Sequence, residues 1–165
     1  MQAIDVRDLT RQPGASRSVH LEESVPGLHL ELAEVPDDRP VACDLKIESV
    51  VEGLFVSGRL AGRMMLRCAR CLKQFEQGFS VEVDEMFVRE PGPDDDAYPV
   101  DPQGVLDPEP MVRDAVMLAM PFSPLCNLDC LGICERCGGD RNLGECSCPQ
   151  RAIDPRWAGL EGLFD

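Results

Sequence analysis

The sequence predicts a mainly β, α+β fold: an antiparallel meander or partly closed barrel with one central helix and a zinc-ribbon-like, cysteine-rich C-terminal lobe. Three observations support this prediction. Apolar and polar residues alternate with period two through much of residues 41–88, as in half-buried strands. Residues 108–120 carry apolar side chains at helical spacing. Eight of the nine cysteines form four close pairs, and six cysteines lie within residues 126–148.

The length of 165 residues suits one domain with extensions. We expect an antiparallel β-rich domain over residues 1–121, and a zinc-binding lobe with a C-terminal tail over residues 122–165. No apolar run approaches the ~20 residues needed to span a bilayer, and residues 1–9 lack the apolar core of a signal peptide. We therefore expect a cytoplasmic protein with reduced thiols and no membrane partner.

The N-terminal residues are expected to form an arm. Apolar residues between 4 and 9 suit a short strand, and residues 11–18 are polar, with a proline and a glycine, as in a loop. Leucines alternate with polar residues over 28–32, which predicts a strand that ends near Pro36. This places His20 in a loop and His29 on the solvent face of a strand, and neither is assigned a function.

Three strands of a meander are expected next. Residues 41–48 have apolar side chains at odd positions, and Gly53 marks the following turn. Residues 54–67 have them at even positions, with two glycines that suggest bends or bulges. The third strand, residues 79–88, changes parity at Met86, as a bulge would cause.

An acidic loop is expected between the meander and the helix. Residues 90–104 hold four prolines, two glycines and four aspartates, so we expect a mobile loop. Asp107 is a suitable N-cap for a helix over about 108–120, and Pro121 ends it. A short terminal helix is expected within residues 154–164.

The cysteine spacing predicts two zinc sites, because zinc takes four Cys or His ligands that usually come in close pairs. The ligands of the first predicted site are local in sequence: Cys134, Cys137, Cys146 and Cys148. The second site, assigned by elimination, joins the middle of the chain to its end: Cys68, Cys71, Cys126 and Cys130. An exchange of pairs between the sites stays open. Cys43 lies in an alternating apolar pattern and is expected to be buried.

Other uses of these thiols fit the sequence less well. Disulfides disagree with a reducing compartment. A redox role for Cys68 and Cys71 would require the first cysteine near a helix N-terminus, whereas this pair follows one expected strand and precedes another. A catalytic zinc would need an open coordination position and a nearby base. We therefore expect two structural zinc ions, although thiolate ligands alone do not distinguish zinc from iron.

Any RNA contact requires a local basic surface, because the formal net charge of −14 opposes generic binding to phosphates and favours basic partners. Residues 59–75 hold five basic residues and no acid. These candidate RNA or partner contacts are Arg59, Arg63, Arg67, Arg70 and Lys73. The alternative is a solvated sheet face, in which these charges pair with Glu48, Glu82 or Asp84 across strands.

Four segments resemble the YceD family of large ribosomal RNA subunit accumulation proteins, in its cysteine-rich bacterial form. They are C-A-R-C-L at residues 68–72, L-A-M-P at 118–121, the cysteine pattern at 126–148, and D-P-R at 154–156. The resemblance extends from about residue 54 to the C-terminus.

The resemblance implies a non-enzymatic role in the accumulation or processing of large-subunit (23S) ribosomal RNA. The expected partners are that RNA or its precursor, or a basic ribosomal protein, and no small-molecule substrate is expected. The resemblance supplies no catalytic residue. An alternative is a zinc-stabilised protein adaptor that does not contact RNA, which the net charge of −14 would suit. A thiol oxidoreductase is a further alternative.

Overall fold

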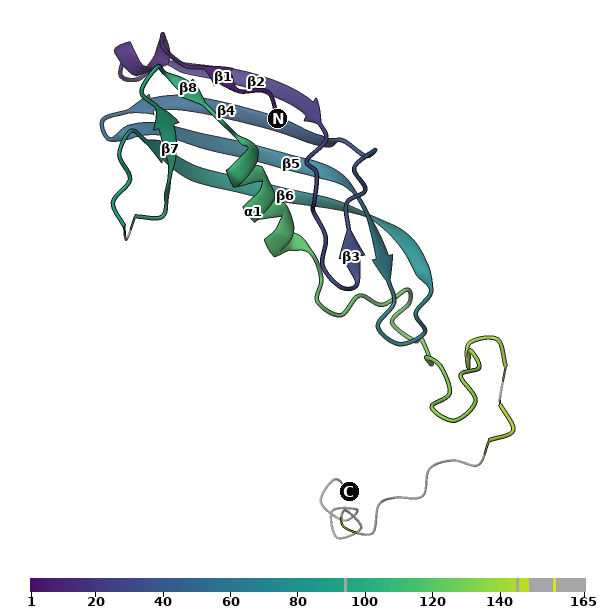
Figure 1. The fold of residues 1–165 in the computed structure, drawn as a ribbon. Coiled ribbons are helices and arrows are strands. Elements are labelled where there is room, and N and C mark those ends of the chain that lie inside the picture. Colours follow the sequence, from purple (N-terminus) through teal and green to yellow (C-terminus); the bar gives the residue numbers. More distant parts are fainter. Residues whose placement is uncertain (94, 145, 149–155, 157–165) are drawn as a thin grey trace.

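The computed structural model describes residues 1–93, 95–144, 146–148 and 156. Within these residues the fold is mainly β, with one α-helix (Figure 1). The elements are β1 (Ile4–Asp5), a 3-10 turn (Leu9–Arg11), β2 (Ser16–Glu23), β3 (Ala33–Glu34), β4 (Val41–Val50), β5 (Gly53–Arg67), β6 (Gln74–Val88), β7 (Ala97–Asp101), β8 (Val105–Leu106) and α1 (Glu109–Ala119).

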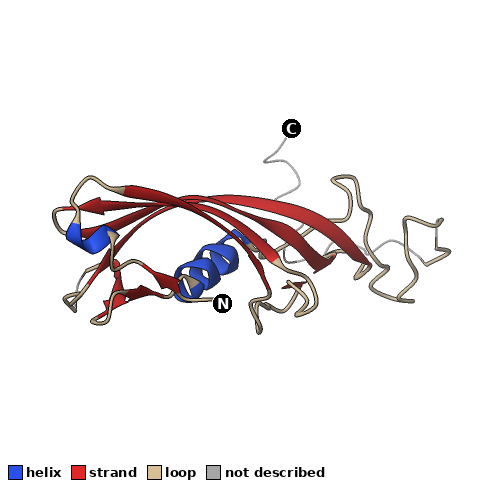
Figure 2. Ribbon diagram, turned by 90° about the horizontal axis from the view of Figure 1, so that it is seen from above, coloured by secondary structure: helices blue, strands red, loops and turns tan. Residues whose placement is uncertain are grey.

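The strands form one sheet in the order β1-β8-β7-β6-β5-β4-β2, and β3 pairs with β5 outside this path. The sheet curls into a half-barrel, and α1 lies on its concave side (Figure 2). The mainly β architecture with one helix is therefore confirmed. The sheet is not wholly antiparallel, because β7 pairs with β6 in parallel.

The hairpin β5–β6 contains the two longest strands of the sheet, of 15 residues each. Even-numbered side chains of β5, such as Leu60 and Met64, are buried, and the arginines at odd positions are exposed. The expected bulge near Met86 is wrong, since the pairing runs without interruption from Leu54–Phe87 to Arg67–Gln74. Phe87 is fully buried and keeps the parity of Val83.

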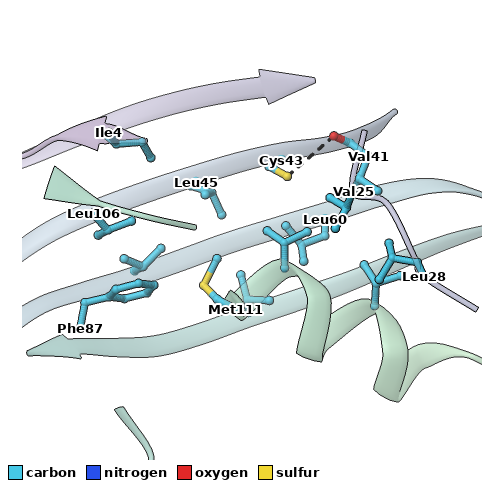
Figure 3. Packing of buried hydrophobic residues seen from close by; sticks show 14 of the residues in the cluster. Ile4, Val25, Leu28, Val41, Cys43, Leu45, Leu60, Phe87, Leu106 and Met111 are labelled. Atoms are coloured by element: carbon cyan, nitrogen blue, oxygen red, sulfur yellow. Dashed lines mark hydrogen bonds between the residues drawn. The ribbon is translucent and has the colours of Figure 1, made fainter. Parts of the chain in front are cut away.

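The core fills the concave side of the sheet (Figure 3). Met111, Val112 and Val116 of α1 are buried with the even-numbered side chains of β5 and the odd-numbered ones of β4. Cys43 is fully buried among them, as predicted. Burial raises the pKa of its thiol to about 11, so this cysteine is held as a neutral apolar side chain.

Two predictions for residues 11–20 are wrong, the loop over residues 11–18 and the place of His20 in a loop. Strand β2 begins at Ser16, inside the expected loop, and contains His20, whose Nδ1 lies 2.6 Å from Asp44 Oδ1. β2 is an edge strand held by its pairing with β4. Only two of its side chains are large and apolar, so its sequence does not show a clear strand pattern. The strand expected from residue 28 to near Pro36 is present only in part: β3 covers Ala33–Glu34, and residues 28–32 contribute only the bridge between His29 and Glu34. The chain turns back at this point, and the Val35 N–H donates to the Leu28 carbonyl (2.8 Å).

The segment 90–104, expected as a loop, contains strand β7. Its proline and aspartate content suggested that it has no apolar surface to bury. However, Val100 is buried, and the Tyr98 ring stacks on Phe87 with centroids 5.2 Å apart. These two contacts anchor β7 between β6 and β8.

Helix α1 falls within the expected residues 108–120. The Asp107 carboxylate accepts a hydrogen bond from the Glu109 N–H (3.0 Å), but the helix begins at Glu109 and Pro108 stands at its N-cap, one residue after the predicted position. Met120 is extended, and Pro121 follows it. No helix in the described part of the chain is long and apolar enough to cross a membrane.

The C-terminal lobe begins after α1. Its described residues contain one isolated β-bridge, Ile133–Asp140, so the zinc-ribbon comparison stays a prediction, as does the division at residue 121. The expected terminal helix at 154–164 lies outside the described residues, apart from Arg156.

Candidate metal centres

The structure gathers the eight predicted cysteines into two groups of four, with the grouping that the sequence suggested. In each group all four Sγ atoms lie within 4.8 Å of one another. We call the first group the hairpin cluster: Cys68, Cys71, Cys126 and Cys130. We call the second group the C-terminal cluster: Cys134, Cys137, Cys146 and Cys148.

The hairpin cluster joins the β5–β6 turn to the segment after α1. Cys68 follows β5, and the turn closes with the Cys68 N–H donating to the Lys73 carbonyl (2.9 Å). Leu72 takes a φ of 61°, a left-handed conformation that is uncommon outside glycine. The Ala69 N–H donates to the carbonyl of Pro124 (2.8 Å), which brings the second cysteine pair to the turn.

The C-terminal cluster is built on a tight knuckle. The Gly138 N–H donates to the Cys134 carbonyl (2.9 Å), and the Cys134 N–H donates to the Gly139 carbonyl (2.8 Å). Gly138 has a φ of 70°, which glycine adopts at little cost. This turn directs Cys134 and Cys137 to the same point, where Cys146 and Cys148 return.

The sulfur separations suit a shared metal ion better than disulfides. Cys68 and Cys130 Sγ lie 3.8 Å apart, and Cys71 and Cys126 Sγ lie 3.6 Å apart. A disulfide requires about 2.05 Å. Four thiolates at about 2.3 Å from a tetrahedral zinc would lie about 3.8 Å from one another. All nine cysteines are free, so the disulfide alternative does not describe this structure.

The two clusters share an electrostatic pattern. Burial opposes ionisation of Cys68, but backbone N–H donors from Cys126, Cys71 and Arg70 outweigh it and lower its pKa to about 6. Backbone N–H groups of Cys137 and Arg136 likewise lower the pKa of Cys134 to about 6. The first cysteine of each C-x-x-C is thereby prepared as a thiolate, the form that binds metal.

One cysteine in the last pair of each cluster behaves in the opposite way. Hydrogen bonding to Cys71, with burial, raises the pKa of Cys126 to about 12. Hydrogen bonding to Cys137, with burial, raises the pKa of Cys148 to about 12. Four thiolates so close together repel one another, so a cation is required if all four are to ionise. The donor set suits a soft metal ion.

Arg70 was predicted as an RNA contact, but its side chain makes hydrogen bonds within the hairpin cluster. Its Nη1 donates to the carbonyls of Cys130 (2.9 Å) and Leu128 (3.4 Å). The Ile133 N–H in turn donates to the Arg70 carbonyl (3.1 Å). Arg70 therefore holds the two halves of the cluster together.

The other four basic residues divide into two pairs. Arg59 donates to Glu82 (2.8 and 3.0 Å), and Arg63 lies 3.1 Å from Glu76. These are the cross-strand ion pairs that the alternative reading expected, although Glu76 was not foreseen. Arg67 and Lys73 are exposed and make no ion pair with any described residue. They flank the hairpin cluster at the end of the sheet.

Sequence reasoning missed one residue near the clusters, Asn142, which lies between Cys137 and Cys146. Its side chain contacts Cys130 of the other cluster. Only its type, a small amide between ligand pairs, offered a signal.

Comparison with known proteins places the chain in a family. The family model described as "Large ribosomal RNA subunit accumulation protein YceD" matches residues 56–164. The chain belongs to the YceD family. The matched region begins in β5 and includes all eight cluster cysteines, so the predicted family is confirmed.

Two relatives of this chain come from mycobacteria. An uncharacterized protein of Mycobacterium tuberculosis strain H37Rv is 35% identical over 163 residues, which cover 95% of this chain and 78% of the relative. An uncharacterized protein of Mycobacterium leprae is 33% identical over 169 residues, covering 98% of this chain and 76% of the relative. No solved structure matches this chain significantly.

Proposed function

We propose that this protein is a non-enzymatic ribosome-biogenesis factor, needed for the accumulation or processing of 23S ribosomal RNA in the cytoplasm. Membership of the YceD family, whose description refers to large ribosomal RNA subunit accumulation, carries this proposal. The protein acts by binding precursor RNA or a ribosomal protein.

Each cysteine cluster holds one structural zinc ion in this proposal. Four sulfur ligands complete a tetrahedral zinc shell and leave no position for a substrate or a reactive water, which is the arrangement of structural sites. The metal supplies a crosslink between segments. The hairpin-cluster cysteines fix the segment after α1 to the β5–β6 turn, and Arg70 supports the same junction from its side.

The contact surface centres on Arg67 and Lys73. Arg59 and Arg63 already have carboxylate partners, whose charge weakens their attraction for phosphate. Arg67 and Lys73 have none among the described residues, and the two positions are kept near each other by the turn that Cys68 and Cys71 close. A chain with a net charge of −14 needs such a local surface to approach RNA.

A matched pair of charge reversals tests this surface. Arg67→Glu with Lys73→Glu removes the two free cations beside the hairpin cluster. Arg11→Glu with Arg89→Glu makes the same change in net charge at two other exposed residues that lack ion pairs with described residues. Each full-length variant is crosslinked in cells, and the attached RNA is sequenced.

We expect the unmodified protein and the Arg11/Arg89 variant to enrich one region of the 23S precursor, and the Arg67/Lys73 variant to lose at least tenfold of that enrichment. Equal enrichment by both variants would mean that Arg67 and Lys73 are not part of the contact surface. A protein that is expressed and recovered but enriches no RNA, and instead captures a basic ribosomal protein, would favour the adaptor alternative, which the net charge also suits.

A further inference from the structure

Asn142 belongs to one cluster by sequence and to the other by contact. It lies between Cys137 and Cys146, two residues of the C-terminal cluster. Its side-chain nitrogen Nδ2 nevertheless lies 3.5 Å from Cys130 Sγ in the hairpin cluster, within donor range for sulfur. Its Oδ1 accepts a hydrogen bond from the Leu131 N–H (2.8 Å). Both ends of the amide are therefore used beside Cys130.

The position of Asn142 depends on the segment between the two clusters. Its own N–H and its Nδ2 both donate to Asp140 Oδ1, at 2.9 and 2.6 Å. The Arg141 N–H donates to the Gly132 carbonyl (2.9 Å), and Ile133 forms a bridge with Asp140. Gly132 in turn packs so closely on the turn that a Cβ there would lie 3.0 Å from the Arg70 carbonyl oxygen. A continuous set of contacts thus runs from the C-terminal knuckle to the β5–β6 turn.

We propose that Asn142 is a positioning residue that couples the filling of the two metal sites. Metal in the C-terminal cluster holds residues 137–146 in place, and this fixes the Asn142 amide against Cys130. The amide donor then stabilises the Cys130 thiolate and strengthens metal binding in the hairpin cluster. Outer-shell hydrogen bonds of this kind typically change metal affinity by about 10- to 100-fold. The inference rests on the proposed metal occupancy and is independent of RNA binding.

The first test compares Asn142→Asp with Asn127→Asp in the full-length protein. At position 142 an aspartate keeps an acceptor for the Leu131 N–H but loses the donor to Cys130. At position 127, next to Cys126, the same substitution adds the same charge near the hairpin cluster. There Oδ1 accepts from the Asp129 N–H (3.2 Å), which an aspartate preserves. Asn142→Ala removes the donor without adding charge.

Metal affinity is read for each cluster separately. Protein reconstituted with zinc is titrated with a chelator, exposed thiols are alkylated, and mass spectrometry reports which cysteines have reacted. We expect Asn142→Asp and Asn142→Ala to weaken metal binding at Cys68, Cys71, Cys126 and Cys130 by about tenfold or more. We expect Asn127→Asp to change it less than threefold. Equal effects of Asn142→Ala and Asn127→Asp would overturn the role of the amide.

The coupling itself requires a double-mutant cycle. Cys148→Ser weakens the C-terminal cluster, and its effect on hairpin-cluster affinity is measured with Asn142 present and with Asn142→Ala. We expect Cys148→Ser to weaken the hairpin cluster only when Asn142 is present. If Cys148→Ser weakens the hairpin cluster equally with Asn142 and with Asn142→Ala, the coupling is overturned. If neither cluster takes up zinc, this inference fails, whereas the proposed contact with ribosomal RNA is still tested by crosslinking.

Discussion

Tyr98, the only tyrosine of the chain, joins the sheet to the helix. Its ring stacks on Phe87 of β6, and its hydroxyl donates to Asp114 Oδ2 of α1 (3.0 Å). Burial, the hydrogen bond to Asp114 and the negative charge of that carboxylate together raise the pKa of Tyr98 to about 12. The neutral phenol is the form that the folded protein favours.

We therefore predict that the phenol ionises near pH 12 in the folded protein, instead of near 10. Because the folded pKa is the higher one, the contribution of Tyr98 to stability is complete below about pH 10. It is lost as the pH rises through 12. Tyrosinate absorbance measures this directly, since no other tyrosine contributes. Asp114→Asn is expected to lower the midpoint part of the way, with burial retaining the rest. A midpoint near 10 while circular dichroism still shows folded protein would contradict the prediction.

Individual residue roles were predictable from the sequence only where the chemistry is local. The C-x-x-C pairs could be recognised as metal ligands because a short turn sets the spacing of the two cysteines. Arg70 also lies in such a pair, but its partners are carbonyls about 60 residues later, at Leu128 and Cys130. No local pattern specifies which distant carbonyl an arginine reaches, so it was mistaken for a free surface charge.

At the scale of elements, close contact between β4 and β5 depends on Gly58. A Cβ at this position would lie 2.1 Å from the Asp44 carbonyl oxygen and 2.9 Å from the Leu45 Cα. Gly62 lies four residues further along the same strand. It faces a side chain instead, since a Cβ there would lie 2.8 Å from the Phe79 ring. A ring at the end of a half-buried side chain can move, whereas paired backbones cannot separate without losing ladder hydrogen bonds.

The two glycines therefore form a matched test of strand pairing. We predict that Gly58→Ala lowers the free energy of unfolding by about 1–3 kcal/mol, the usual cost of overpacking. Gly62→Ala is expected to cost less than about 1 kcal/mol, because the Phe79 ring can turn aside. Urea unfolding of both variants measures the difference. The reverse order of the two costs would show that β4 and β5 are not held as closely as described.

Elements with a clean period were predicted well, and elements that depend on neighbours were not. β4 and β5 each bury one face, so their alternation is visible in the sequence. β2 and β7 have few large apolar residues, and each is held by the strand beside it: β2 by β4, and β7 by β6 and β8. The parallel pairing of β6 and β7 could not be predicted either, because β7 has too few large apolar residues to show a strand pattern.

At the scale of the whole molecule, the cysteine clusters and the apolar core are separate sources of order. The core cluster of buried residues includes side chains from β4, β5, β6 and α1, but none of the eight cluster cysteines. The hairpin cluster instead closes a long loop, from Cys68 to Cys130, at the end of the half-barrel. Removing a metal ion would therefore release the segment after α1 without opening the core.

This separation predicts a local response to metal removal. When the zinc-loaded protein is treated with a strong chelator under reducing conditions, we expect faster amide hydrogen exchange in residues 122–148 and around residues 68–73. Amides in the paired centres of β4 and β5 are expected to stay protected, since their core contacts do not involve the clusters. Restored zinc, but not magnesium, should reverse the change, because thiolates bind soft metal ions and magnesium prefers oxygen ligands. Loss of protection throughout the sheet would mean that the clusters and the core fold as one unit. No change anywhere would mean that the clusters do not hold metal in this protein.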